Sequence, residues 1–147
     1  MKYLLALFVL FFAGCASTST SPSLASQILT PANIDKATKD GLTAAGQLFL
    51  ANNPSYAPEV QAAADAFLAL SVSNPASITA TDITAALAKA PLTPKTREEI
   101  AAGATLALSI FETDFHVNLP ALTPNYASFA LAVAQGLQAA VPAKASP

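Results

Sequence analysis

Alanine is the most abundant residue of this chain and occupies 34 of its 147 positions. Because alanine is the best helix former and is depleted from strands, a chain of this kind folds into helices if it folds at all. Charged residues make up only 11% of the chain, well below the roughly 25% that is typical of soluble domains. We therefore predict a single all-α domain that is stabilised by side-chain packing.

A repeated dipeptide indicates where helices begin. Thr-Pro occurs at Thr30-Pro31, Thr93-Pro94 and Thr123-Pro124. A threonine at the N-cap accepts a hydrogen bond from a backbone N–H that has no partner in the helix, and proline at the first helical position has no N–H to leave unpaired. Each pair therefore predicts a helix start. Their spacings of 63 and 30 residues form no fixed period, so the chain is not a repeat protein.

Apolar residues at helical spacing, interrupted by Asn and Pro, divide the chain into helical segments. Connections of only a few residues favour antiparallel packing of successive helices. We predict a small alanine-rich antiparallel bundle of four to five helices within residues 30–142. The expected helices cover residues of about 31–51, 55–73, 80–90, 94–114 and 124–141.

The larger apolar residues of each predicted helix fall on one face, which should form the core. Alanines four residues apart, at Ala62-Ala66 and Ala130-Ala134, predict close seams between helices, while Gly41 and Gly46 should weaken the first helix. The residues predicted to be buried are Ile34, Ala37, Ala45, Leu48, Phe49, Val60, Ala64, Phe67, Leu68, Val72, Ile83, Leu87, Ile100, Ala104, Leu108, Phe111, Phe115, Tyr126, Phe129, Ala130, Val133, Leu137, Ala140 and Val141.

The first 14 residues have the character of an export signal. Lys2 supplies a positive charge, and residues 3–13 form an apolar run. As a helix, this run would span only about 16 Å, roughly half of the hydrocarbon core of a bilayer. We therefore predict that residues 1–14 are a signal peptide and not a membrane-spanning helix.

The only cysteine follows this run directly. Phe12-Ala13-Gly14-Cys15 resembles the lipobox of bacterial lipoproteins, although the first position of that motif is usually Leu, Val or Ile. In that family the cysteine is diacylated on sulfur, released by the lipoprotein signal peptidase and acylated on its new amine. The resemblance implies fatty acids such as palmitate at Cys15. The alternative is ordinary signal-peptidase cleavage after Ala16, which would release an unanchored protein.

Anchoring through two or three acyl chains is stable, because each buried CH₂ contributes about 0.8 kcal/mol. In lipoproteins of many Gram-negative bacteria, Asp after the cysteine favours retention in the inner membrane, and here that residue is Ala16. The resemblance thus implies a lipid-anchored protein of the bacterial cell envelope, on the periplasmic face of the outer membrane if the source is Gram-negative. Residues 15–29 are predicted to be a flexible Ser/Thr-rich tether, and residues 143–147 a disordered tail.

Charge and cysteine content argue against several classes of function. The net charge of −2 comes from scattered single charges and offers no basic stripe, so binding to nucleic acid is not expected. A single cysteine excludes an intramolecular disulfide, a thiolate metal cluster and a Cys-x-x-Cys redox pair.

Residues 112–116 contain the only histidine, His116, together with two carboxylates at the end of the fourth predicted helix. They could form a metal site, but a solvated helix end with a histidine near the negative end of the helix dipole is the interpretation we favour. Glu98 and Glu99 are adjacent, point in different directions and suit a helix start. We predict no catalytic, cofactor-binding or metal-binding residue.

An anchored bundle without catalytic motifs is best interpreted as a non-catalytic interaction or structural module, which binds an envelope protein or associates with itself. One alternative is a carrier that holds a lipid or small apolar ligand among Phe67, Phe111, Phe115 and Phe129. A further alternative is an enzyme that uses His116 and the nearby carboxylates.

Overall fold

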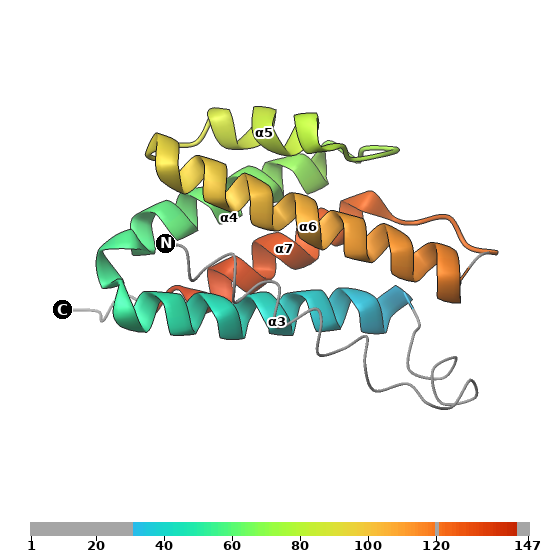
Figure 1. The fold of residues 1–147 in the computed structure, drawn as a ribbon, viewed down its shortest axis with the longest axis horizontal. Coiled ribbons are helices and arrows are strands. Elements are labelled where there is room, and N and C mark those ends of the chain that lie inside the picture. Colours follow the sequence, from blue (N-terminus) through green and yellow to red (C-terminus); the bar gives the residue numbers. More distant parts are fainter. Residues whose placement is uncertain (1–30, 120, 144–147) are drawn as a thin grey trace.

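The computed structural model describes residues 31–119 and 121–143, except for the side chains of Asp114 and Asn118. The predicted signal peptide, the tether and residues 144–147 of the predicted tail lie outside these ranges. Within them the chain forms helices and no strand, which confirms the all-α bundle (Figure 1). The helices are α3 (Pro31–Asn52), the 3-10 helix η1 (Pro54–Tyr56), α4 (Ala57–Val72), α5 (Ala80–Ala88), α6 (Pro94–Asn118) and α7 (Tyr126–Ala140).

Two predicted helix starts can be compared with the structure, because Thr30 lies outside the described residues. The Thr93 side chain accepts a hydrogen bond from the Thr96 backbone N–H, which confirms the start of α6. The start predicted at Thr123-Pro124 is wrong, since the Asn125 side chain accepts from the Ser128 N–H at 3.0 Å and α7 begins at Tyr126, two residues after the predicted Pro124. Asparagine is the stronger N-cap, so it sets this boundary.

Helix lengths differ from the prediction at two places. α6 continues through Asn118, one turn beyond the predicted end at Asp114, because the first helix breaker is Pro120, and the residue before a proline disfavours helical geometry. His116 therefore lies in the last turn of α6. The segment after α3 begins with one 3-10 turn before α4 starts at Ala57.

The C-terminal helix α7 is the centre of the bundle, because it packs along both α3 and α4. Its partner α3 is the first helix of the described residues, and the two run in the same direction (Figure 1). Their contacts establish the direction, because the residue numbers increase along both helices together. Asp35 lies beside Ser128, Thr43 beside Gly136 and Gly46 beside Ala140. The first helix therefore finds its main partner at the other end of the sequence.

The seam between α3 and α7 depends on two glycines. A Cβ on Gly46 would lie 2.4 Å from the Cβ of Ala140. A Cβ on Gly136 would lie 2.7 Å from the Cβ of Leu42 and 2.8 Å from the carbonyl oxygen of Lys39. Real Cβ atoms do not approach so closely, so the helices are packed at a distance that only glycine permits.

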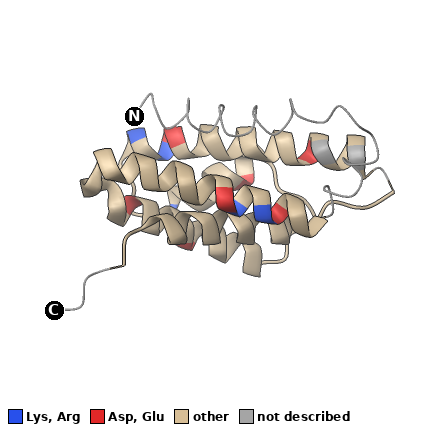
Figure 2. Cartoon of the chain, turned by 90° about the horizontal axis from the view of Figure 1, so that it is seen from below, with Lys and Arg blue, Asp and Glu red and all other residues tan. Residues whose placement is uncertain are grey.

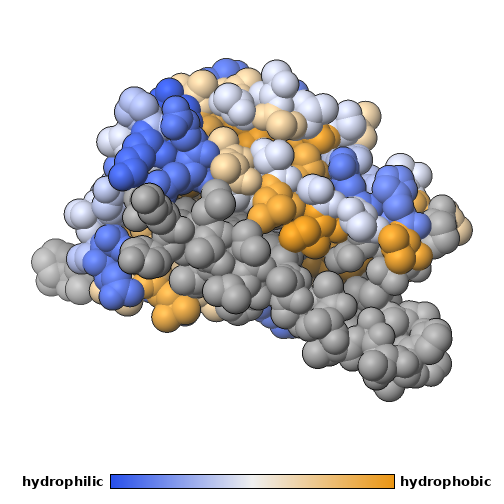
Figure 3. Space-filling model, in the orientation of Figure 1, coloured by the Kyte–Doolittle hydropathy of each residue, from blue (hydrophilic) through white to orange (hydrophobic). Residues whose placement is uncertain are grey.

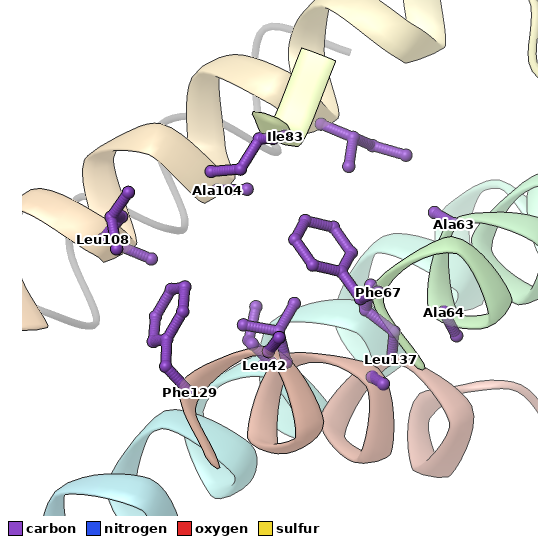
Figure 4. Close-up of a cluster of buried hydrophobic side chains, with 14 of the residues drawn as sticks. Leu42, Ala63, Ala64, Phe67, Ile83, Ala104, Leu108, Phe129 and Leu137 are labelled. Atoms are coloured by element: carbon purple, nitrogen blue, oxygen red, sulfur yellow. The ribbon is translucent and has the colours of Figure 1, made fainter. Parts of the chain in front are cut away.

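α6 lies farther from α7, and aromatic rings fill the space between them. The ring centroid of Phe111 lies 4.8 Å from that of Phe115 and 4.9 Å from that of Phe129. Figure 4 shows Phe67 and Phe129 extending from the lower helices towards Ala104 and Leu108 on α6. Large side chains thus hold α6 over the close-packed layer of α3, α7 and α4.

Most of the residues predicted to form the core are buried, including the whole α6 stripe from Ile100 to Phe115. Four predictions are wrong, because Ala37, Leu48, Leu68 and Val72 are exposed. On α3 the face covered by α7 carries Thr38, Gly41 and Leu42, so the other edges of the helix face solvent. On α4 the buried face carries Val60, Ala63, Ala64 and Phe67 and leaves Leu68 and Val72 outside.

Substitution of Gly46 by alanine tests the seam. In an open helix the change would stabilise the protein by about 0.5–1 kcal/mol. Here the new methyl group meets Ala140, so we expect a destabilisation of about 1–3 kcal/mol in urea unfolding followed by circular dichroism. Adding Ala140→Gly should restore part of the loss, which a double-mutant cycle measures. A Gly46→Ala variant that is more stable than the parent would contradict this packing.

Candidate functional site

The aromatic residues considered for a ligand cavity form packed core. Phe67, Phe111, Phe115 and Phe129 are all at most 3% exposed. The void beside Phe67, between α3, α4, α6 and α7, has a volume of about 30 Å³, which is close to the share of one water molecule in the liquid. This void is far smaller than the several hundred Å³ of a typical ligand site.

His116 lies at an exposed position near the end of α6. The His116 side chain faces solvent in the last turn of α6. One turn before it, Glu112 accepts a 2.9 Å hydrogen bond from the Tyr126 hydroxyl. The pKa of Tyr126 is raised, mainly by burial and to a smaller extent by this hydrogen bond. Within the described residues, no three His, Cys, Asp or Glu side chains are grouped to hold a metal ion. Glu112 thus joins α6 to the start of α7.

Other carboxylates also hold helix ends together. Glu59, on the first turn of α4, accepts hydrogen bonds from the backbone N–H and the hydroxyl of Thr93, both at 3.2 Å. Asp35 accepts a hydrogen bond from the Ser128 hydroxyl and thereby joins the start of α3 to the start of α7. Burial raises the pKa of Asp35, and the bond to Ser128 opposes that rise. These links join segments 34 and 93 residues apart, which no local pattern signals.

The two adjacent glutamates on α6 differ in environment and do not act as a pair. Glu98 is exposed, whereas Glu99 is half-buried and its Oε2 has no hydrogen bond within the described residues. Neighbouring positions on a helix point about 100° apart, so the two carboxylates face different surroundings. Nothing in this arrangement places two carboxylates on either side of a substrate.

An open groove lies between α4 and α5. Its volume is about 530 Å³. Figure 1 shows these two helices side by side, on the opposite side of the bundle from α3. The groove is lined by Ala62, Asp65, Ala66, Ala69, Leu70, Ser73, Asp82, Ala85, Ala86, Lys89, Ala90 and Pro91. Sequence reasoning did not identify it.

Small side chains create this groove. α4 turns Ala62, Ala66 and Ala69 towards it, and α5 turns Ala85 and Ala86. Because a methyl group extends little beyond the backbone, facing alanines leave space between two helices unless the helices approach closely. The apolar floor of the groove is therefore accessible from outside.

Charged residues stand around this apolar floor. Asp82 accepts hydrogen bonds from the Thr79 hydroxyl and backbone N–H, which lower its pKa, so Asp82 is ionised at neutral pH. Asp65 accepts a 2.9 Å bond from the Gln61 side chain. Lys89 follows the last residue of α5. The groove thus combines an apolar floor with two carboxylates and one ammonium group.

The alanine pairs of the sequence separate into two kinds. Ala130 and Ala134 are fully buried in α7, which confirms the seam predicted for them. Ala62 and Ala66 are only half-buried and face the groove. The spacing of alanines therefore identifies faces where helices can approach, but not which of those faces remain open.

Cys15, the predicted lipidation site, lies outside the described residues. Of the helices that the structure describes, none has the length and apolar character to cross a bilayer. No protein-family model matches the chain, and no match was found among curated proteins or solved structures.

Replacing Phe67 tests whether the aromatic interior is packed core. Phe67 is 1% exposed, so we expect Phe67→Ala to destabilise the protein by about 3–5 kcal/mol in urea unfolding. The neighbouring Leu68 is 36% exposed and serves as a control, for which Leu68→Ala should cost at most about 1 kcal/mol. Equally small losses at both positions would indicate an adaptable cavity instead of a filled core.

Proposed function

We propose that this protein is a lipid-anchored module of the bacterial cell envelope that binds a partner protein in the groove between α4 and α5. The observation that carries the binding role is the groove itself, since about 530 Å³ of apolar-floored space lies open on a bundle whose interior is filled. Small-molecule pockets typically have volumes of about 300–1,000 Å³, so the groove is large enough to hold a few side chains of a partner. No chemistry is assigned to the module.

The lining of the groove favours one class of occupant. Facing alanines accept a narrow segment, so the bound chain would be a short peptide with small apolar side chains. Asp65 and Asp82 outnumber Lys89, so a Lys or Arg beside that apolar segment would gain favourable electrostatic contact. We therefore assign the groove to an apolar peptide segment of an envelope protein, flanked by a basic residue.

The anchor in this proposal rests on the amino-terminal sequence. The positive residue, the apolar run and Phe12-Ala13-Gly14-Cys15 follow one another as in bacterial lipoproteins. Lipid on Cys15 would hold the bundle at the membrane while the groove binds its partner. The carrier and enzyme alternatives have no comparable support, because the void beside Phe67 is about 30 Å³ and Glu112 is bonded to Tyr126.

The anchor is tested by Cys15→Ala. Because the acyl chains provide stable attachment, the variant should move from the membrane fraction to the soluble fraction, while the parent remains with the membranes. Metabolic labelling with a palmitate analogue should mark the parent and not the variant. Absence of the palmitate-analogue label from the parent would refute the lipoprotein assignment.

The groove is tested by site-specific photo-crosslinking in cells. A photoreactive amino acid at Ala69, in the groove, should form a defined adduct, whereas one at Ala102, exposed on α6, should not. Ala85→Arg places a long charged side chain in the groove and should reduce that adduct by about tenfold, because its cation repels the basic residue of the partner and its stem occupies the floor.

Ala88→Arg provides the matched control for this experiment. Ala88 is exposed on the same helix as Ala85 but does not line the groove, so the adduct from position 69 should be unchanged. Equal loss with both arginine variants would argue against the groove. An adduct made of two copies of this chain would contradict the assigned occupant and favour self-association.

A further inference from the structure

One end of the bundle receives the chain from the predicted tether. α3 begins there at Pro31. The first turns of α7 lie beside it, as the bond between Asp35 and Ser128 requires, and the last turns of α6 join the same end through Glu112 and Tyr126. Figure 1 shows the connection between α4 and α5 at this end as well. We call this region, with the connections at residues 73–79 and 119–125, the tether end.

Exposed large apolar side chains are concentrated on elements that meet at the tether end. Val72, the last residue of α4, is 77% exposed, and Val117, in the last turn of α6, is 70% exposed. Leu122, in the connection to α7, is 50% exposed. A single exposed valine or leucine is ordinary, but three on one end of a small bundle form a feature that a partner surface can use.

The two connections at the tether end, and the residues around them, contain no charged side chain. Residues 71–81 and 115–128 contain no Asp, Glu, Lys or Arg. At the opposite end, the connection from α5 to α6 contains Lys89, whereas the connection from α3 to α4 contains no charged residue. Figure 2 shows charged residues along α3 and α6 and none on the connection between α6 and α7. In Figure 3, hydrophobic surface is visible where α6 ends.

Three carboxylates near the tether end are bonded within the protein. Asp35 accepts from Ser128, Asp82 from Thr79 and Glu112 from Tyr126. Bringing these three carboxylates towards a low-dielectric surface costs less than it would for carboxylates without hydrogen bonds.

We propose that the tether end rests on the lipid surface, with Val72, Val117 and Leu122 inserted into the headgroup region. The inference rests on the proposed anchoring, in which the 16 residues from Cys15 to Thr30, with a reach of at most about 55 Å, connect the bilayer directly to this end of the bundle. A short tether raises the effective concentration of the surface to the millimolar range, so a few apolar side chains suffice. In this orientation the groove between α4 and α5 lies on the side of the bundle and opens parallel to the membrane plane.

The test places a polarity-sensitive fluorophore on single cysteines in the lipidated protein. Cys15 carries the lipid and is the only native cysteine, so Val117→Cys, Leu122→Cys and Leu48→Cys each provide one labelling site. Leu48 is 54% exposed, similar to Leu122, but lies in the second half of α3, away from the tether end. The labelled proteins are reconstituted into vesicles of phosphatidylethanolamine and phosphatidylglycerol that contain a headgroup-level nitroxide lipid.

We expect nitroxide quenching at positions 117 and 122 to exceed that at position 48 by about threefold, because interfacial side chains lie about 5–10 Å into the headgroup boundary. Equal quenching at position 48 and at either of the other positions overturns the proposal, as does a label that is shielded from water but not quenched by lipid. Vesicle flotation separates this failure from that of the anchor: loss of the parent from the vesicles refutes the anchoring itself.

Discussion

The close seam between α3 and α7 is the constraint on which the rest of the bundle depends. Gly46 and Gly136 allow the two helices to approach until the Thr43 hydroxyl reaches the Gly136 carbonyl oxygen at 3.3 Å. Because α7 also packs along α4, this seam fixes the layer on which α6 rests. The first and last helices must therefore meet before the fold is complete, and the contacts that define it are distant in sequence.

The packing around alanine differs between three parts of this bundle. In the seams of α7 it lets backbones approach, and Ala130 and Ala134 are completely buried. Below α6, where helices are farther apart, alanine could not fill the space, and Phe111 and Phe129 do so instead. Between α4 and α5 the helices do not approach closely and no large side chain fills the space, so the facing alanines leave a groove. The groove is thus the place where small residues lack both a close neighbour and a large side chain opposite.

The sequence predicts the helices well, because alanine content, caps and apolar spacing are local properties; the α6 stripe and the start at Thr93 are examples. It predicts less where two local signals compete, as at Thr123 and Asn125, or where the neighbour of a helix decides which edge is covered, as at Leu48. The glycine seam and the groove could not be predicted, because both depend on which helices become neighbours. Lipidation of Cys15 remains a prediction from a resemblance.

The number of helices decides which connections lie at the end where the chain enters the bundle. α3 and α7 run in the same direction, so the chain enters the described fold at one end and leaves it at the other. The five described α-helices alternate in direction, so the connections that follow α4 and α6 lie at the end where the chain enters the fold. These connections lack charged residues. At the other end, the connection between α3 and α4 also lacks them, and the connection between α5 and α6 contains Lys89. If the proposed anchor places a membrane on the entry side, that membrane meets Val72, Val117 and Leu122 and leaves the part of the groove beyond Ser73 in water.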